Sequence, residues 1–165
     1  MSASIFLKSI AKKISNKIVI ANLDFGLQKG DRLAVIGANG CGKTPLLKII
    51  AGIIDVDTGQ IFINGEELNS KKYSLRKKIC FIPDYIDFDN NLNINENLYI
   101  YLKLNTFYSD KESKDLINHW SEVFNFQKLL KLKIDKITKS KLRLIQLCRA
   151  FMHNPEFLVL DHPTV

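Results

Sequence analysis

Residues 37–44, with the sequence GANGCGKT, constrain the fold of this chain more than any other segment. An apolar run, DRLAVIG, leads into them, and PLLKIIAGI follows with apolar side chains at helical spacing. Glycines permit a tight loop whose backbone N–H groups point at an anion, and the start of a helix adds partial positive charge. The pattern G-x-x-x-x-G-K-[ST] in this context predicts a buried strand, a phosphate-binding loop and a helix, rather than a chance glycine-rich turn.

Two side chains of the phosphate-binding loop (residues 37–44) carry chemistry of their own. Lys43 can reach the β- and γ-phosphates of a nucleotide, and the hydroxyl of Thr44 can bind Mg²⁺. Pro45 is unusual, because it has no N–H to donate to a phosphate, although its φ suits the first turn of a helix. We therefore expect a nucleotide with Mg²⁺ as the ligand. The residues expected to bind the nucleotide are Gly37, Ala38, Asn39, Gly40, Cys41, Gly42, Lys43, Thr44 and Pro45, with Thr44 also at the metal.

The rest of the chain predicts an α/β fold. Short strands are expected within residues 1–30, closed by a turn at Lys29-Gly30-Asp31, and again at QIFING, KICFIP and FLVLD. Between the last two strands the pattern becomes helical: over about residues 93–133, with a Ser109-Asp110 cap inside that region, and over about residues 140–153. This order of elements is typical of an α/β core with added parts.

Composition excludes several classes of protein. The best apolar stretch, LLKIIAGII, falls well short of the ~18 residues of a membrane span. The three cysteines are far apart and form no CxxC pair, which argues against a zinc site or a disulfide scaffold. The net charge of +7 comes from lysines spread through ordinary surface stretches, so we expect no nucleic-acid partner. The basic first residues favour short strands, and we expect no cleaved leader.

Taken together, these motifs resemble the nucleotide-binding domain of ABC transporters. The resemblance is carried by GANGCGKTPLLKIIAGIIDVDTGQIFING, by KICFIP, by NINENL and by RAFMHNPEFLVLDHPT, and it covers essentially the whole chain. It implies a P-loop (RecA-like) core with an N-terminal antiparallel β-subdomain and a helical subdomain, without the C-terminal part of the core. The expected boundaries are 1–30 for the β-subdomain, 31–91 for the P-loop core, 92–148 for the helical subdomain and 149–165 for the end of the core.

The resemblance also implies an activity and partners. Members of this family hydrolyse ATP as two domains that sandwich two nucleotides, and they drive an integral membrane transporter subunit. We therefore expect a second nucleotide-binding domain, in a homodimer or heterodimer, and a peripheral position on the cytoplasmic face of a membrane. Asp161 would be the Walker B carboxylate that holds Mg²⁺ through water. The helical region resembles exporter-type domains, among them the haem-export ATPase of cytochrome c maturation.

The sequence departs from the family pattern at many sites, and three of them bear directly on hydrolysis. His162 stands where the family has its general base, a glutamate, and losing a positioned base typically costs about 10²–10⁴ in rate. Asp84 stands where the family has a glutamine that senses Mg²⁺ and the attacking water. Residues 137–141, ITKSK, replace the LSGGQ signature and lack both of its glycines. Catalysis through His162 and a metal contact from Asp84 are therefore open predictions.

Three hypotheses on function follow. The chain is a working ATPase subunit of a transporter, or it binds MgATP with little turnover, as an inert partner or regulatory module. The third hypothesis is a truncated product without independent function. The departures at His162 and residues 137–141 favour impaired hydrolysis over efficient hydrolysis.

Overall fold

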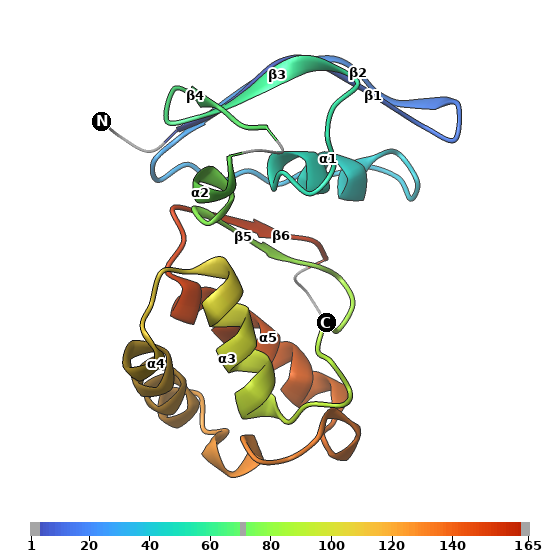
Figure 1. Cartoon of the computed structure of the whole chain (residues 1–165). Helices are drawn as coiled ribbons and strands as arrows, with labels where there is room; N and C mark the ends of the chain where they lie inside the picture. Colours follow the sequence, from blue (N-terminus) through green and yellow to red (C-terminus); the bar gives the residue numbers. More distant parts are fainter. Residues whose placement is uncertain (1–3, 70–71, 163–165) are drawn as a thin grey trace. The chain divides into compact units, whose positions relative to one another are not determined.

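The structure is a computed structural model that describes residues 4–69 and 72–162 (Figure 1). Its contacts divide the chain into two compact units, Met1–Phe81 and Ile82–Val165. The first unit contains the phosphate-binding loop, and the second contains Asp84, Asp161 and His162.

An antiparallel sheet of four strands forms the first unit, in the order β2-β1-β3-β4. β1 (Ser4–Ile14) and β2 (Lys17–Gln28) form a hairpin whose turn residues, Ser15 and Asn16, both have positive φ. β3 (Thr58–Ile63) pairs with β1, and β4 (Glu66–Glu67) follows the Asn-Gly turn. The strands expected within residues 1–30 and at QIFING are confirmed.

The sheet buries one face beside helix α1 (Lys43–Ile50), which runs along the sheet in Figure 1. A short helix, α2 (Tyr73–Arg76), was not expected from the sequence. Gly52, two residues after the end of α1, has a φ of +68°, a conformation that glycine commonly adopts just after a helix. The buried apolar residues of this unit are Ile5, Leu7, Ile10, Ile20, Ile49, Ile50, Ala51, Ile61, Ile63, Leu75, Ile79 and Cys80.

The strand expected before the phosphate-binding loop is absent. Residues 31–38 have no regular secondary structure, and the side chains of Leu33 and Ile36 are 49% and 91% exposed. An apolar run becomes a buried strand only when another strand supplies its hydrogen bonds and a layer covers its faces. Within the described residues, no strand pairs with this segment.

Three main helices form the bulk of the second unit. They are α3 (Ile94–Asn105), α4 (Asp110–Val123) and α5 (Lys139–His153), with the short 3₁₀ helices η1 (Gln127–Leu129) and η2 (Ile134–Lys136) before α5. Asn93 and Ser109 begin α3 and α4 with complete capping boxes, which confirms the expected cap at Ser109. β5 (Ile79–Ile82) ends at the first residue of this unit, and β6 (Phe157–Leu160) follows α5.

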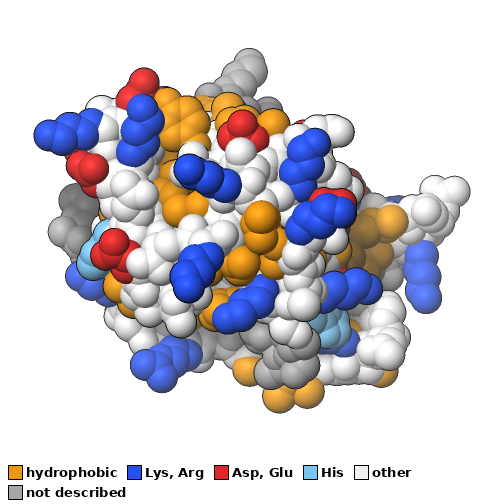
Figure 2. All heavy atoms as spheres, turned by 90° about the horizontal axis from the view of Figure 1, so that it is seen from below, with side chains coloured by type: hydrophobic (Ala, Val, Ile, Leu, Met, Phe, Trp, Pro, Cys, Tyr) orange, Lys and Arg blue, Asp and Glu red, His pale blue; other side chains and the backbone are white. Residues whose placement is uncertain are grey.

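None of the described helices is long and apolar enough to cross a membrane. Figure 2 shows one face of the molecule, on which Lys and Arg side chains are interspersed with acidic and apolar ones. The basic residues on this face therefore do not form one continuous patch.

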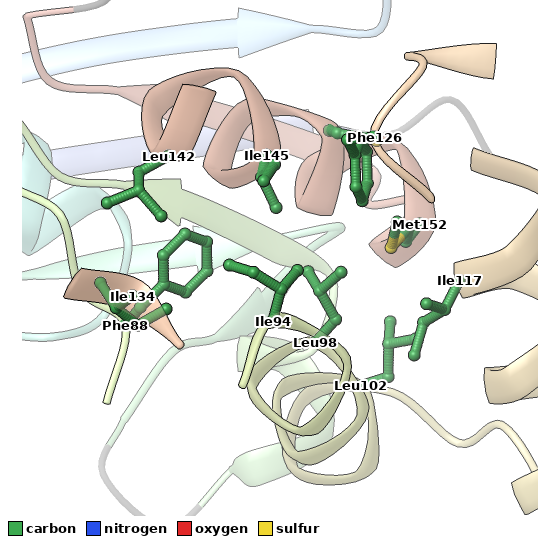
Figure 3. Packing of buried hydrophobic residues seen from close by; sticks show 11 residues of the cluster. Phe88, Ile94, Leu98, Leu102, Ile117, Phe126, Ile134, Leu142, Ile145 and Met152 are labelled. Atoms are coloured by element: carbon green, nitrogen blue, oxygen red, sulfur yellow. The ribbon is translucent and has the colours of Figure 1, made fainter. Parts of the chain in front are cut away.

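The helical core of the second unit is a single apolar cluster (Figure 3). Helix α3 contributes a stripe at positions i, i+4 and i+8, which is the spacing of one helix face. Helix α5 supplies a second stripe that packs against it. The members of the cluster are Phe88, Ile94, Leu98, Leu102, Ile117, Phe126, Ile134, Leu142, Ile145, Cys148 and Met152.

Candidate functional site

The phosphate-binding loop is an exposed turn that leads directly into α1. Gly40 and Gly42 adopt φ angles of +76° and +101°, which glycine reaches without strain. Gly42 is the N-cap residue of α1, and no side chain caps the helix there. The first backbone N–H groups of a helix have no partner inside the helix, so this end can receive an anion.

The Lys43 side chain folds back over the loop. Its Nζ donates hydrogen bonds of 2.8 Å to the carbonyl oxygens of Gly37 and Ala38, and lies 4.0 Å from Sγ of Cys41. The ammonium group is thus held beside the loop backbone by neutral acceptors. A phosphate is a stronger acceptor, since hydrogen bonds between charged groups are roughly twice as strong as neutral ones.

Thr44 and Pro45 lie in the first turn of α1 and are half-buried. The amide of Leu46 donates to the carbonyl oxygen of Gly42 at 3.0 Å and begins the helical hydrogen bonds. Proline is tolerated at Pro45 because its missing N–H belongs to the first turn, where the helix itself does not need it. A phosphate bound at this turn would therefore accept one backbone N–H hydrogen bond fewer than it would if residue 45 were not proline.

In the second unit, Asp161 lies directly after β6 and is only 2% exposed. Its amide donates a 2.9 Å hydrogen bond to the carbonyl oxygen of Ile82, the last residue of β5. Asp84 and His162 are exposed, and His162 has a φ of +47°. The backbone segments that carry Asp84, Asp161 and His162 are thereby close together, at the ends of β5 and β6.

One buried side chain joins these segments further. Arg143 of α5, 6% exposed, donates through Nη1 to the carbonyl oxygen of Pro83. Its Nη2 donates to the carbonyl oxygens of Asp161 at 3.2 Å and His162 at 2.9 Å. Burial against carbonyl oxygens was not predicted.

Further buried polar residues of α5 bind the segment that follows β5. Nε2 of Gln146 donates to the carbonyl oxygen of Tyr85 at 2.8 Å and to Oδ1 of Asp87 at 2.9 Å. Arg149 forms a 2.7 Å ion pair with Asp87, and its guanidinium lies 4.1 Å from the ring centroid of Tyr101. The spacing of Arg143, Gln146 and Arg149 along one helix face is the signal by which the sequence could have revealed this set.

The segment that replaces the family signature, residues 137–141, spans the start of α5. Thr138 is the N-cap residue, but its side chain makes no capping hydrogen bond. Residues 138–141 are exposed, and the first turn of α5 contains no acidic residue. This helix start is therefore open to an anion, with Lys139 and Lys141 beside it.

The donors available for a metal suit Mg²⁺. The described residues contain no group of three or more His, Cys, Asp or Glu side chains that could hold a metal ion. Mg²⁺ prefers oxygen donors and is usually bound by one or two carboxylates together with substrate phosphates and waters. The Thr44 hydroxyl in the first unit and the buried Asp161 carboxylate in the second are each a donor of this kind, so the chemistry of each residue fits Mg²⁺.

Comparison with known proteins agrees with these features. The family model described as ABC transporter matches residues 20–165. The Nod factor export ATP-binding protein I of Burkholderia thailandensis is 29% identical over 162 residues, which cover 98% of this chain and 53% of that protein. The Fe(3+) ions import ATP-binding protein FbpC of Vibrio cholerae is 28% identical over 159 residues, 96% of this chain and 45% of that protein.

The fold agrees as well. A dimeric ATP-binding cassette, in a post-hydrolysis state with ADP and Pi, matches 97% of this chain with a TM-score of 0.83 at 21% sequence identity. The chain spans about half the length of the curated relatives it matches. With the motif, the fold and the family model in agreement over most of its length, the chain belongs to the ATP-binding domain family of ABC transporters.

Proposed function

We propose that this chain binds ATP with Mg²⁺ as part of an ABC transporter and hydrolyses it slowly. The observation that carries the proposal is the phosphate-binding loop. It combines two glycines at positive φ, a helix start without a side-chain cap, and a lysine held over the loop by weak neutral acceptors. Mg²⁺ bound with the nucleotide would neutralise phosphate charge, with Thr44 and Asp161 as the protein groups that hold it.

Slow hydrolysis is expected from His162. The family has a glutamate at this position, and the loss of a positioned general base typically lowers the rate by about 10²–10⁴. An imidazole differs from a carboxylate in reach and charge, and it becomes cationic when it accepts a proton. The side chain of His162 is exposed on a backbone of positive φ. A metal contact from Asp84 belongs to the same proposal.

A second candidate is an inert nucleotide-binding partner of an active domain. It is favoured by residues 138–141, which are exposed at the start of α5 and contain no glycine. Family members use this segment to bind the nucleotide of the opposite domain. Two lysines here would attract phosphate without the close backbone approach that glycines permit. A heterodimer with an intact partner would then hold one active site and one inactive site.

The transported substrate belongs to the membrane subunit in this family, so the chain itself does not specify it. The relatives named above include one export ATP-binding protein and one import ATP-binding protein. Exporter-type function, the similarity to haem export and a peripheral position on the cytoplasmic face remain predictions. The partners we propose are an integral membrane subunit and a second nucleotide-binding domain.

The test is nucleotide binding by the purified chain, followed with a fluorescent ATP analogue and a phosphate-release assay. Lys43→Ala should weaken binding by about 100-fold, because it removes a charged donor to the phosphates. Lys48→Ala removes the same charge from the last turn of α1 and serves as the matched control. His162→Glu should raise phosphate release in the presence of a family partner domain.

Three outcomes separate the candidates. Binding that depends on Lys43, with slow release, supports the proposal. Fast release that is lost in both Lys43→Ala and His162→Ala would make the histidine a working base and contradict slow hydrolysis. An absence of binding by the wild-type chain would contradict the nucleotide-binding function itself.

A further inference from the structure

Arg143 is a buried cation whose hydrogen bonds go to three backbone carbonyl oxygens and one side-chain oxygen. Its Nη1 donates to the carbonyl oxygen of Pro83 and, at 2.8 Å, to Oε1 of Gln146. Its Nη2 donates to the carbonyl oxygens of Asp161 and His162. Burying a guanidinium is costly unless its donors are satisfied. At Arg143 the compensating oxygens come from three separate parts of the second unit.

The carbonyl groups that Arg143 binds belong to the two strand tips, defined here as residues 83–84 after β5 and residues 161–162 after β6. The side chains that these tips carry are Asp84, Asp161 and His162. Arg143 touches the backbone of each tip. It therefore fixes the backbone positions from which the candidate metal and catalytic side chains extend.

The geometry of a guanidinium suits this task. Its donors lie in one rigid plane, so a single side chain can bind several oxygens at fixed angles. A lysine ammonium is a point charge on a flexible stem. It would reproduce the charge of the guanidinium but not its planar arrangement of donors. The positive φ of His162 adds a reason for such a hold, because a non-glycine residue in this region persists only when its surroundings stabilise it.

We infer that Arg143 is a positioning residue that holds the two strand tips together, so that Asp161, with Asp84 and His162 beside it, is correctly placed for the Mg²⁺ of a bound nucleotide. The inference rests on the proposed function and extends it to a residue whose hydrogen bonds go to the backbone of the tips and to Gln146. Partners that orient metal ligands typically change metal affinity by about 10- to 100-fold when they are replaced.

Arg149 provides a matched control on the same helix. It is also buried, 3% exposed, and its charge is paired with Asp87 at 2.7 Å. Its guanidinium lies over the rings of Tyr101 and Phe88. The ion pair with Asp87 and the two ring contacts of Arg149 involve neither strand tip. Arg149→Lys therefore perturbs a buried arginine to a similar degree, and the tips should keep their arrangement.

The experiment compares the wild-type chain, Arg143→Lys, Arg143→Gln and Arg149→Lys. The affinity for a fluorescent ATP analogue is measured once with Mg²⁺ and once with EDTA, and the ratio is the magnesium enhancement. Amide hydrogen exchange is followed in peptides that contain the two strand tips. Circular dichroism shows whether each variant folds. Arg143→Lys is used if it folds, and Arg143→Gln is used if it does not.

We expect Arg143→Lys to keep the affinity in EDTA and to lose about 10- to 100-fold of the magnesium enhancement. Exchange should accelerate at the strand tips and not in α3 or α4. Arg149→Lys should retain the enhancement. A general loss of stability would lower the affinity with Mg²⁺ and the affinity with EDTA by the same factor, so the magnesium enhancement would not change.

Several results would overturn the inference: an unchanged magnesium enhancement in Arg143→Lys, an equal loss in Arg149→Lys, or unchanged exchange at the tips. Wild-type binding that is the same with Mg²⁺ and with EDTA would also overturn it, while leaving nucleotide binding intact. If the wild-type chain binds no nucleotide, the proposed function fails and the metal role of Arg143 fails with it. The exchange data then decide separately whether Arg143 holds the tips.

Discussion

Gly42 lies against Val19 of β2, so closely that a Cβ atom added to the glycine would come within 2.9 Å of the Val19 carbonyl oxygen. The phosphate-binding loop therefore touches the sheet of its own unit at one of its glycines. The turn and the sheet constrain each other at this point, and the contact is a property of tertiary packing rather than of the motif.

Gly42→Ala should destabilise the chain by about 2 kcal/mol or more, because it combines a positive φ with a backbone clash. The matched control is Gly40→Ala, where φ is +76° and an added Cβ atom meets nothing within 4 Å. That variant should lose only about 1 kcal/mol. Urea unfolding followed by circular dichroism measures both. Equal losses in the two variants would show that the contact with Val19 has no energetic role.

Pro45→Ala should tighten nucleotide binding by about 10-fold. The alanine restores a backbone N–H in the first turn of α1, and a hydrogen bond to a charged group contributes about 1.5–3 kcal/mol. The affinities for ATP and for adenosine, which has no phosphate, are compared by titration. The gain should appear with ATP only. A gain of the same size with adenosine would mean that the new amide does not act on a phosphate.

Asp57 should stabilise the first unit in a pH-dependent way. Its carboxylate accepts 2.7 Å hydrogen bonds from Nζ of Lys12 and from the amide of Lys13, and these contacts lower its pKa below the ordinary 3.8. A carboxyl group with a lowered pKa in the folded state stabilises above its unfolded pKa, and this contribution disappears as pH falls through the folded pKa.

Asp57→Asn should therefore be less stable than the wild type from about pH 5 to 8, and the difference should shrink below about pH 4. Unfolding midpoints in urea at a series of pH values provide the measurement. Asp55→Asn, which removes the same charge two residues earlier in the chain, is the control. A difference that persists unchanged at pH 2 would refute an ionic origin.

The thiol groups of the three cysteines should react at different rates. Burial raises the pKa of Cys148 to about 12, so its thiol stays protonated at pH 8, and Cys80 is fully buried as well. Cys41 is exposed in the phosphate-binding loop. A disulfide reagent at pH 8 should modify one thiol quickly in the native chain, and all three in urea. MgATP should slow the fast reaction, and Cys41→Ser should remove it. Fast modification of Cys148 in the folded chain would contradict its burial.

The features that the sequence predicted best depend on neighbouring residues. The phosphate-binding loop, the helix after it, the cap at Ser109 and the end of α5 before Asn154-Pro155 are all encoded within a few positions. Glycine and proline conformations, capping hydrogen bonds and helical spacing act over one or two turns of chain. For this reason they could be predicted without knowledge of the fold.

Other features depend on residues far away in the chain. Residues 31–38 have the composition of a buried strand, yet they form none, because a strand exists only through hydrogen bonds to another strand. The acceptors of Arg143 at Pro83 and Asp161 lie 60 and 18 positions away in the sequence. Spacing along α5 places Arg143 on a helix face, and only packing decides which oxygens that face meets.

The sequence by itself determined the family, and it predicted the candidate ligands and the residues that would hold them, since all of these follow from contiguous motifs. The tertiary structure alone decided how those residues are held. It placed the Gly42 backbone against Val19 and bound Arg143 to the tips of β5 and β6. Both are contacts between segments distant in sequence, and their energy comes from close packing and from the need to satisfy buried polar groups, which no local pattern encodes.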